Sequence, residues 1–133
     1  MINANIYVKK REVTFETVVV MDLKIDKRGL KLIPQQSRAV KQHDVHEFIV
    51  TMEEKSPGEK IDKVAYIGFA EALHSGLIVR DERVFIENKK IGKVLGFDVT
   101  HAPNHINIVI KVDNLQNGRE MDLSPGNKIT FRG

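Results

Sequence analysis

The chain has 133 residues, of which 41% are apolar and 29% charged, with a formal net charge of +3 and no cysteine. This balance is typical of one globular domain covering residues 1–133. It excludes a disulfide framework, a thiolate nucleophile and a cysteine-ligated zinc, and no run approaches the roughly 18 to 20 apolar residues of a membrane span.

The segment Met1–Asn5 lacks the charged start and the apolar run of a secretion signal, so we expect a cytoplasmic protein. Basic residues are spread along the chain, and there is no tryptophan. Nucleic-acid binding usually needs a concentrated basic face with aromatic stacking platforms. The composition therefore does not favour a nucleic-acid partner.

The first predicted element is a long strand over residues 13–25. Apolar side chains alternate with polar ones in this run, which is the period of a strand with one buried face. Its length indicates that it is bent or shared between two sheet layers. The apolar positions are Val13, Phe15, Val19, Met21, Leu23 and Ile25, with Thr17 among them.

The middle of the chain holds two further predicted strands. Residues 34–44 are polar and are expected to form a loop or a single helical turn. Alternation then resumes over residues 45–52. Residues 64–70 are continuously apolar, and we favour a strand there because Gly68 and the β-formers weaken a helix.

The remaining strands are separated by turn signals. A tight hairpin is predicted around Asn88-Lys89, and a clear alternation follows over residues 106–112. Asn117-Gly118 and residues 124–127 are expected to frame two short final strands. Turns recurring about every 8 to 12 residues predict an all-β fold, a single small closed or nearly closed β-barrel.

The densest polar cluster joins two predicted strands, where a scaffold often presents a functional loop. We expect it to contact a small-molecule ligand or a protein partner, although the same residues could also serve purely structural roles. The expected ligand-binding residues are Asp98, Thr100, His101, Asn104 and His105.

A metal site is an alternative for the same loop. Imidazole and carboxylate ligands suit a divalent transition metal such as zinc, iron or nickel. The candidate ligands are Asp98, His101, His105 and, across the sheet, His46. Pro103 lies between the two loop histidines, which favours an irregular turn over a helix.

Residues 71–131 carry four segments in a recognisable order: Leu73-His74-Ser75-Gly76-Leu77, then Val94-Leu95-Gly96, then His105 opening the strand to Val112, then Leu123-Ser124-Pro125-Gly126-Asn127-Lys128-Ile129. In these segments the chain resembles the glucitol/sorbitol-specific enzyme IIA component of the bacterial phosphotransferase system. The resemblance implies a compact β-barrel.

The same resemblance implies a phosphocarrier whose histidine, on an earlier strand, accepts phosphate. The two ways of matching that strand place Val64 or Met52 at the position, and neither is a histidine. We therefore predict a non-catalytic binding or accessory barrel, which could also form a homodimer through exposed edge strands. The alternatives are a phosphocarrier using His46, His74 or His105, and a metal-dependent enzyme using Asp98, His101 and His105.

Overall fold

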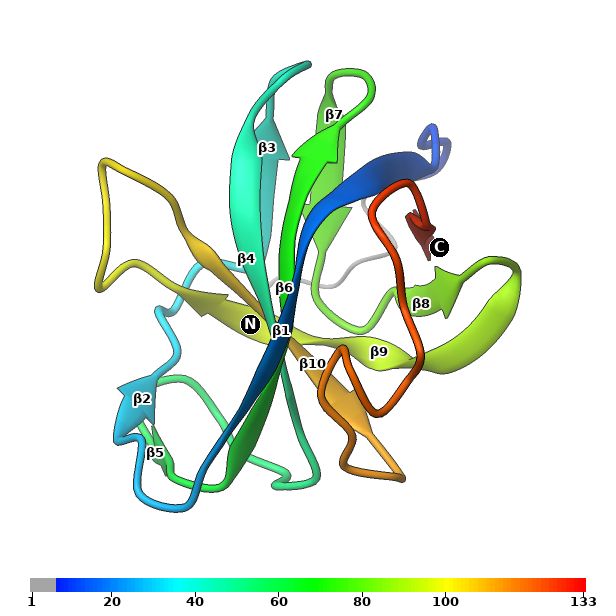
Figure 1. Cartoon of the computed structure of the whole chain (residues 1–133). Helices are drawn as coiled ribbons and strands as arrows, with labels where there is room; N and C mark the ends of the chain where they lie inside the picture. The colour runs from blue at the N-terminus through cyan, green and yellow to red at the C-terminus, as the bar shows by residue number, and fades with distance from the viewer. Residues whose placement is uncertain (1–6) are drawn as a thin grey trace.

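Seven strands close into a barrel in the order β1-β11-β8-β9-β10-β4-β6, in a computed structural model that describes residues 7–133 (Figure 1). The prediction of an all-β closed barrel is confirmed. The strands are β1 (Val13–Ile25), β4 (Val45–Thr51), β6 (Val64–Ala72), β8 (Arg83–Ile86), β9 (Lys89–Asp98), β10 (Asn107–Val112) and β11 (Lys128–Arg132).

Within residues 7–133, no helix of the length and apolarity needed to cross a membrane is found. The expectation about a secretion signal concerns Met1–Asn5, which lie outside the described residues.

The interior of the barrel is filled by alternate side chains of its strands. Phe15, Phe48 and Phe131 are completely buried. The ring centroids of Phe15 and Phe48 lie 5.1 Å apart, edge to face, and those of Phe48 and Phe131 lie 6.0 Å apart. Aromatic contacts of this kind add to the hydrophobic stabilisation that the buried area provides.

A second, smaller apolar layer covers the outer face of part of the barrel. The short strands β2 (Leu30–Lys31) and β5 (Lys60–Ile61) pair with each other beside the barrel (Figure 1). Leu30 and Ile61 pack there with Ile49 and Tyr66. Strands β4 and β6 are therefore buried on both faces, which explains the continuous apolar run at residues 64–70 and confirms that it is a strand.

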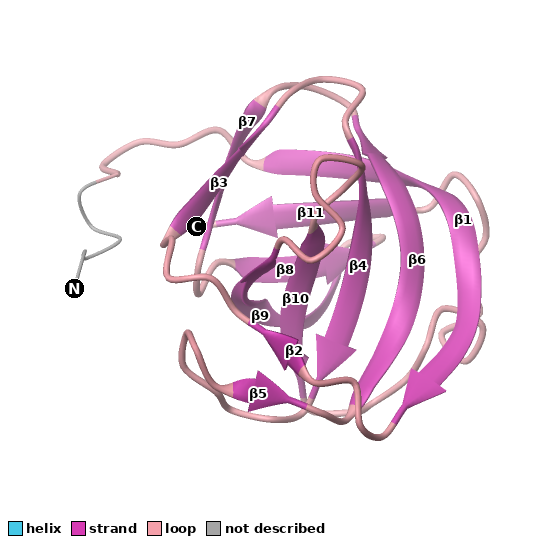
Figure 2. Cartoon of the chain, turned by 90° about the vertical axis from the view of Figure 1, so that its left-hand side faces the viewer, coloured by secondary structure: helices cyan, strands magenta, loops and turns pink. Residues whose placement is uncertain are grey.

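Residues 34–44 contain a strand, so the expectation of a loop or helical turn was wrong. Strand β3 (Ser37–Val40) pairs with β7 (Gly76–Val79), and Figure 2 shows the two as a ribbon set off from the barrel wall. Val40 and Ile78 still reach the interior core. Strand β3 has only four residues, of which Ser37 and Arg38 are polar and Val40 alone is a buried apolar residue, so it shows no alternation that would have identified it.

Strand β1 has the predicted bounds, but its alternation does not match one buried face. Phe15 and Thr17 are buried, whereas Val19 and Leu23 are 48% and 38% exposed. The register of β1 against β6 shifts between Thr17 and Val19 and again between Val20 and Leu23. Each bulge adds an unpaired residue and redirects the following side chains, so the bend was predicted but the buried face was not.

The predicted hairpin is confirmed with its turn one residue earlier. Glu87 and Asn88 form the turn between β8 and β9, with φ angles of 47° and 70°. Two consecutive residues with positive φ are typical of the tight turn that suits twisted strands.

Between Val112 and the C-terminus only β11 forms, so the expectation of two final strands was wrong. Residues 113–127 form a loop instead.

Candidate functional site

The two neighbouring residues His46 and Glu47 lie on opposite faces of β4. His46 points into the barrel, where its ring lies 6.5 Å from that of Phe15, and its Nδ1 accepts a hydrogen bond from the backbone N–H of Ile106 at 3.1 Å. Glu47 is directed to the outer face, because side chains alternate along a strand. The wall of the barrel therefore separates His46 from the groups around Glu47.

Asp98 ends β9 and organises the loop that follows. Its carboxylate accepts hydrogen bonds from the backbone N–H and the hydroxyl of Thr100, at 3.0 and 2.9 Å. It also accepts one from the side-chain amide of Asn107, at 3.0 Å. Asp98 is 3% exposed and Asn107 is fully buried. These contacts give Asp98 and Thr100 a structural role as a turn cap.

His105 lies between the loop and the barrel wall. Its Nδ1 accepts a hydrogen bond from the side-chain amide of Asn104 at 2.8 Å. Its Nε2 lies 3.7 Å from Oε1 of Glu47, and its ring packs edge-on against Phe69 at 5.0 Å. The ring of the exposed His101 lies 5.1 Å away from the ring of His105. The structure brings the two loop histidines together and adds Glu47, which sequence reasoning missed.

Burial changes the titration of two of these groups. Desolvation raises the pKa of Glu47, and the positive charge on a protonated His105 opposes this shift. Desolvation lowers the pKa of His46, and the carboxylate of Asp44 opposes that shift. In each case burial disfavours the charged form of the side chain.

The proposed metal ligands are not gathered by the fold. Among residues 7–133, no three His, Cys, Asp or Glu side chains form a group that could hold a metal ion. His46 lies on the other side of the barrel wall, and the oxygens of Asp98 are engaged by Thr100 and Asn107. The metal site therefore stays a hypothesis that this geometry does not favour.

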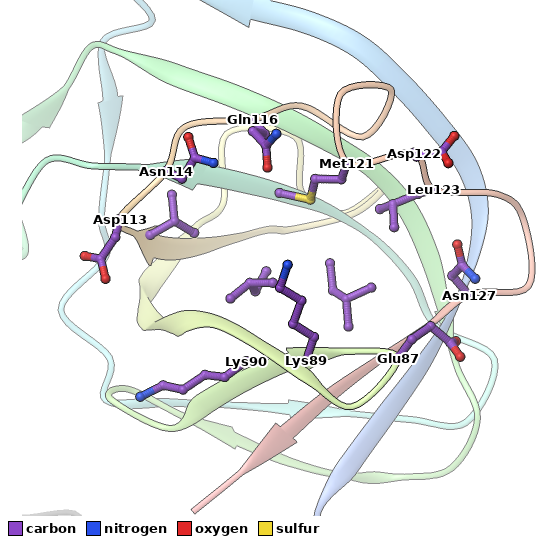
Figure 3. Close-up of a pocket in the computed structure, with 13 residues that line it drawn as sticks. Glu87, Lys89, Lys90, Asp113, Asn114, Gln116, Met121, Asp122, Leu123 and Asn127 are labelled. Atoms are coloured by element: carbon purple, nitrogen blue, oxygen red, sulfur yellow. The ribbon is translucent and has the colours of Figure 1, made fainter.

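A pocket opens at one end of the barrel. It is bordered by the β8–β9 hairpin, the end of β10 and the loop 113–127. We call it the mouth pocket; its volume is about 600 Å³ (Figure 3). Its apolar lining packs directly on the interior core. The lining residues are Ile86, Glu87, Lys89, Lys90, Ile91, Val112, Asp113, Asn114, Gln116, Met121, Asp122, Leu123 and Asn127.

The pocket stays open because the loop 113–127 crosses the end of the barrel and does not add a strand there. Its Gly118 N–H donates to the carbonyl of Tyr66, and its Arg119 N–H donates to the carbonyl of Met21. A Cβ on Gly118 would lie 2.1 Å from the carbonyl oxygen of Ile67, so only glycine allows this close approach. The loop is thereby held against β1 and β6, away from the β8–β9 hairpin.

Sequence reasoning missed the mouth pocket entirely. Lys89 was interpreted as a turn residue, and Met121 and Leu123 lie in a loop without alternation. The available signal in the sequence was the presence of apolar residues, such as Met121 and Leu123, in a segment rich in turn residues. That signal does not reveal which strands the loop will cross.

Comparison with known proteins identifies no activity for this site. No curated protein and no solved structure matches the chain. One family model matches residues 7–132, and its description is that of a family of unknown function, DUF6917. Because the match spans almost the whole sequence, the chain belongs to the DUF6917 family.

Proposed function

We propose that this protein is a non-catalytic binding barrel that holds a small, partly apolar molecule in the mouth pocket. The observation that carries the proposal is the pocket itself, about 600 Å³ in volume at the end of a closed barrel. Small-molecule sites commonly have volumes of about 300 to 1,000 Å³ and often occupy the mouths of β-barrels.

The composition of the lining supports binding rather than catalysis. Ile91, Met121 and Leu123 are partly buried and would be covered further by a ligand. The lining residues include no histidine, serine or threonine within the described part of the chain. The pocket therefore lacks the common pairing of a nucleophile with a base that covalent catalysis uses.

The loop from Asp98 to His105 supports a binding role less well. Asp98 and Thr100 bond to each other, and Asn104 bonds to His105. These polar groups are used within the loop, whereas Figure 3 shows the ammonium group of Lys89 directed into the mouth pocket. Contact of this loop with a partner protein stays a prediction from the sequence, as does the cytoplasmic location.

Phosphoryl transfer is the alternative that the sequence resemblance implies. Two of the three candidate histidines are poorly accessible, because the ring of His46 is buried and hydrogen-bonded and the side chain of His105 is only 10% exposed. His74 is only half-buried, with its Nδ1 3.2 Å from the carbonyl oxygen of Ser75, so it is the candidate that a partner could reach. A phosphocarrier needs an imidazole nitrogen that its partner can reach. Incubation with phosphoenolpyruvate, enzyme I and the histidine phosphocarrier protein tests the alternative, and stable labelling of a histidine would favour it over our proposal.

Titration with N-phenyl-1-naphthylamine, a neutral dye whose emission rises in apolar surroundings, tests the proposed function. We expect saturable binding of one dye per chain. Met121→Gln replaces an apolar lining group by an amide and should weaken binding about fivefold or more. Met52→Gln is the matched control, because Met52 is 53% exposed and does not line the pocket.

Two results would contradict the proposal. One is the absence of saturable dye binding to the folded wild-type protein. The other is equal loss of dye affinity in the Met121→Gln and Met52→Gln variants, both with thermal unfolding curves like that of the wild type.

A further inference from the structure

The charged side chains that line the mouth pocket point in different directions, some into the pocket and some away from it. Figure 3 shows the ammonium group of Lys89 pointing into the pocket, whereas the side chain of Lys90 leads away from it. No hydrogen bond or ion pair of the Lys89 ammonium is found among residues 7–133. The pocket therefore contains a cation that no protein carboxylate neutralises by direct contact.

The carboxylates of the lining do not compensate this charge. Oε2 of Glu87 accepts a hydrogen bond from the backbone N–H of Lys128 at 2.6 Å. Asp113 is fully exposed and lies 3.9 Å from the ammonium of Lys111. Figure 3 shows the carboxylates of Asp113 and Asp122 directed outward from the pocket. All three acids belong to the rim.

Neutral polar groups and apolar groups line the pocket together with Lys89. Figure 3 shows Asn114 and Gln116 at the upper edge of the pocket, with the side-chain oxygen of Gln116 directed into it and Met121 and Leu123 nearby. An amide side chain that rotates can present its N–H groups to an anion. Lys89 is itself exposed, so its attraction for an opposite charge strengthens only when a bound molecule excludes water from the pocket.

We infer that the mouth pocket selects an organic anion, with Lys89 as the residue that determines this specificity. The anionic group, a carboxylate or a phosphate monoester, pairs with Lys89 and accepts hydrogen bonds from Asn114 or Gln116. The apolar body of the same molecule packs on Met121 and Leu123. This inference rests on the proposed function and adds to it the chemical class of the ligand.

Displacement of the neutral dye by four eight-carbon probes tests the inference. Octanoate and octyl phosphate carry the proposed anionic groups, octan-1-ol is neutral, and octylammonium is cationic. We expect octanoate or octyl phosphate to bind about tenfold more tightly than octan-1-ol, and octylammonium to bind most weakly. Comparing the two anions shows which anionic group fits the pocket better.

Substitution of Lys89 should remove the preference for anions without removing the pocket. Lys89→Met should reduce the affinity for the preferred anion about tenfold and change that for octan-1-ol less than about twofold. Lys89→Arg keeps the charge and should restore most of the anion affinity. Lys60→Met is the control, because Lys60 is an exposed lysine on β5 that does not line the pocket.

The outcomes separate this inference from the proposed function. If the neutral dye binds but octan-1-ol binds as tightly as both anions, or Lys89→Met leaves the anion affinity unchanged, the inference is wrong and the binding function stands. If neither the dye nor any probe binds, the proposed function itself is wrong, and the inference is overturned with it.

Discussion

Nε2 of His105 lies 3.7 Å from Oε1 of Glu47 on the outer face of the barrel, and the two side chains are only 10% and 8% exposed. Nε2 of His105 is buried and makes no hydrogen bond, because a separation of 3.7 Å is too long for one. The carboxylate of Glu47 is therefore buried beside an imidazole that does not hydrogen-bond to it.

The raised pKa of Glu47 predicts a pH dependence of stability. A carboxyl group whose pKa is higher in the folded state stabilises the fold below its ordinary pKa, 4.5, and this contribution is lost as pH rises through the raised value. Glu47→Gln should therefore reduce the loss of stability on going from pH 4.5 to pH 7. Urea unfolding at both pH values measures the difference.

The control for this prediction is Glu54→Gln, because the side chain of Glu54 is 66% exposed. Its stability profile should parallel that of the wild type. A Glu47→Gln profile that also runs parallel to the wild type would contradict the role assigned to Glu47.

The lowered pKa of His46 predicts the opposite dependence. A neutral buried imidazole contributes stability above its ordinary pKa, 6.5, and this contribution is lost as pH falls through the lowered value. His46→Gln should flatten the decline in melting temperature below pH 6.5. Its stability at pH 7.5 should fall by about 1 to 3 kcal/mol if the acceptor for the Ile106 N–H is lost. A decline below pH 6.5 as steep as that of the wild type would refute this account.

Gly68 is predicted to be essential for the bulge between β1 and β6. A Cβ at Gly68, where φ is 145°, would lie 1.8 Å from the carbonyl oxygen of Val19. Gly68→Ala should destabilise the protein by about 3 kcal/mol or more, since strain and a backbone clash add. Gly58 has a φ of 89° and open space around it, so Gly58→Ala should lose only about 1 to 2 kcal/mol. Equal losses in chemical denaturation would show that the clash is relieved elsewhere.

Removal of divalent metals is expected to leave the protein unchanged. The oxygens of Asp98 already bond to Thr100 and Asn107, and His46 lies on the opposite face of the wall. Adding zinc after treatment with EDTA should shift the melting temperature by less than about 1 °C, because only a ligand that binds the folded state stabilises it. A rise of several degrees that disappears in His101→Ala would revive the metal hypothesis.

Local pattern was sufficient to predict the strands of the barrel wall. The alternation at residues 13–25, 45–52 and 106–112 and the apolar run at 64–70 each correspond to an observed strand. Side-chain period and turn chemistry are properties of short segments, so they can be read without knowing the partners of a strand.

The candidate site was predicted only in part. His101 and His105 are close in sequence and are also close in space. Glu47 reaches His105 only because β4 pairs with β10 in parallel, with Glu47 opposite Asn107. No local pattern reports a parallel pairing between strands 60 residues apart.

The sequence by itself determined the fold class, the absence of cysteine chemistry and the positions of the main strands, because these depend on composition and short-range periodicity. Only the tertiary structure decided which face of β1 is buried beyond its bulges, that residues 37–40 form a strand, and that the loop 113–127 opens the mouth pocket in front of Lys89. These features depend on contacts between distant segments, and loop crossings and strand registers form only when the barrel closes.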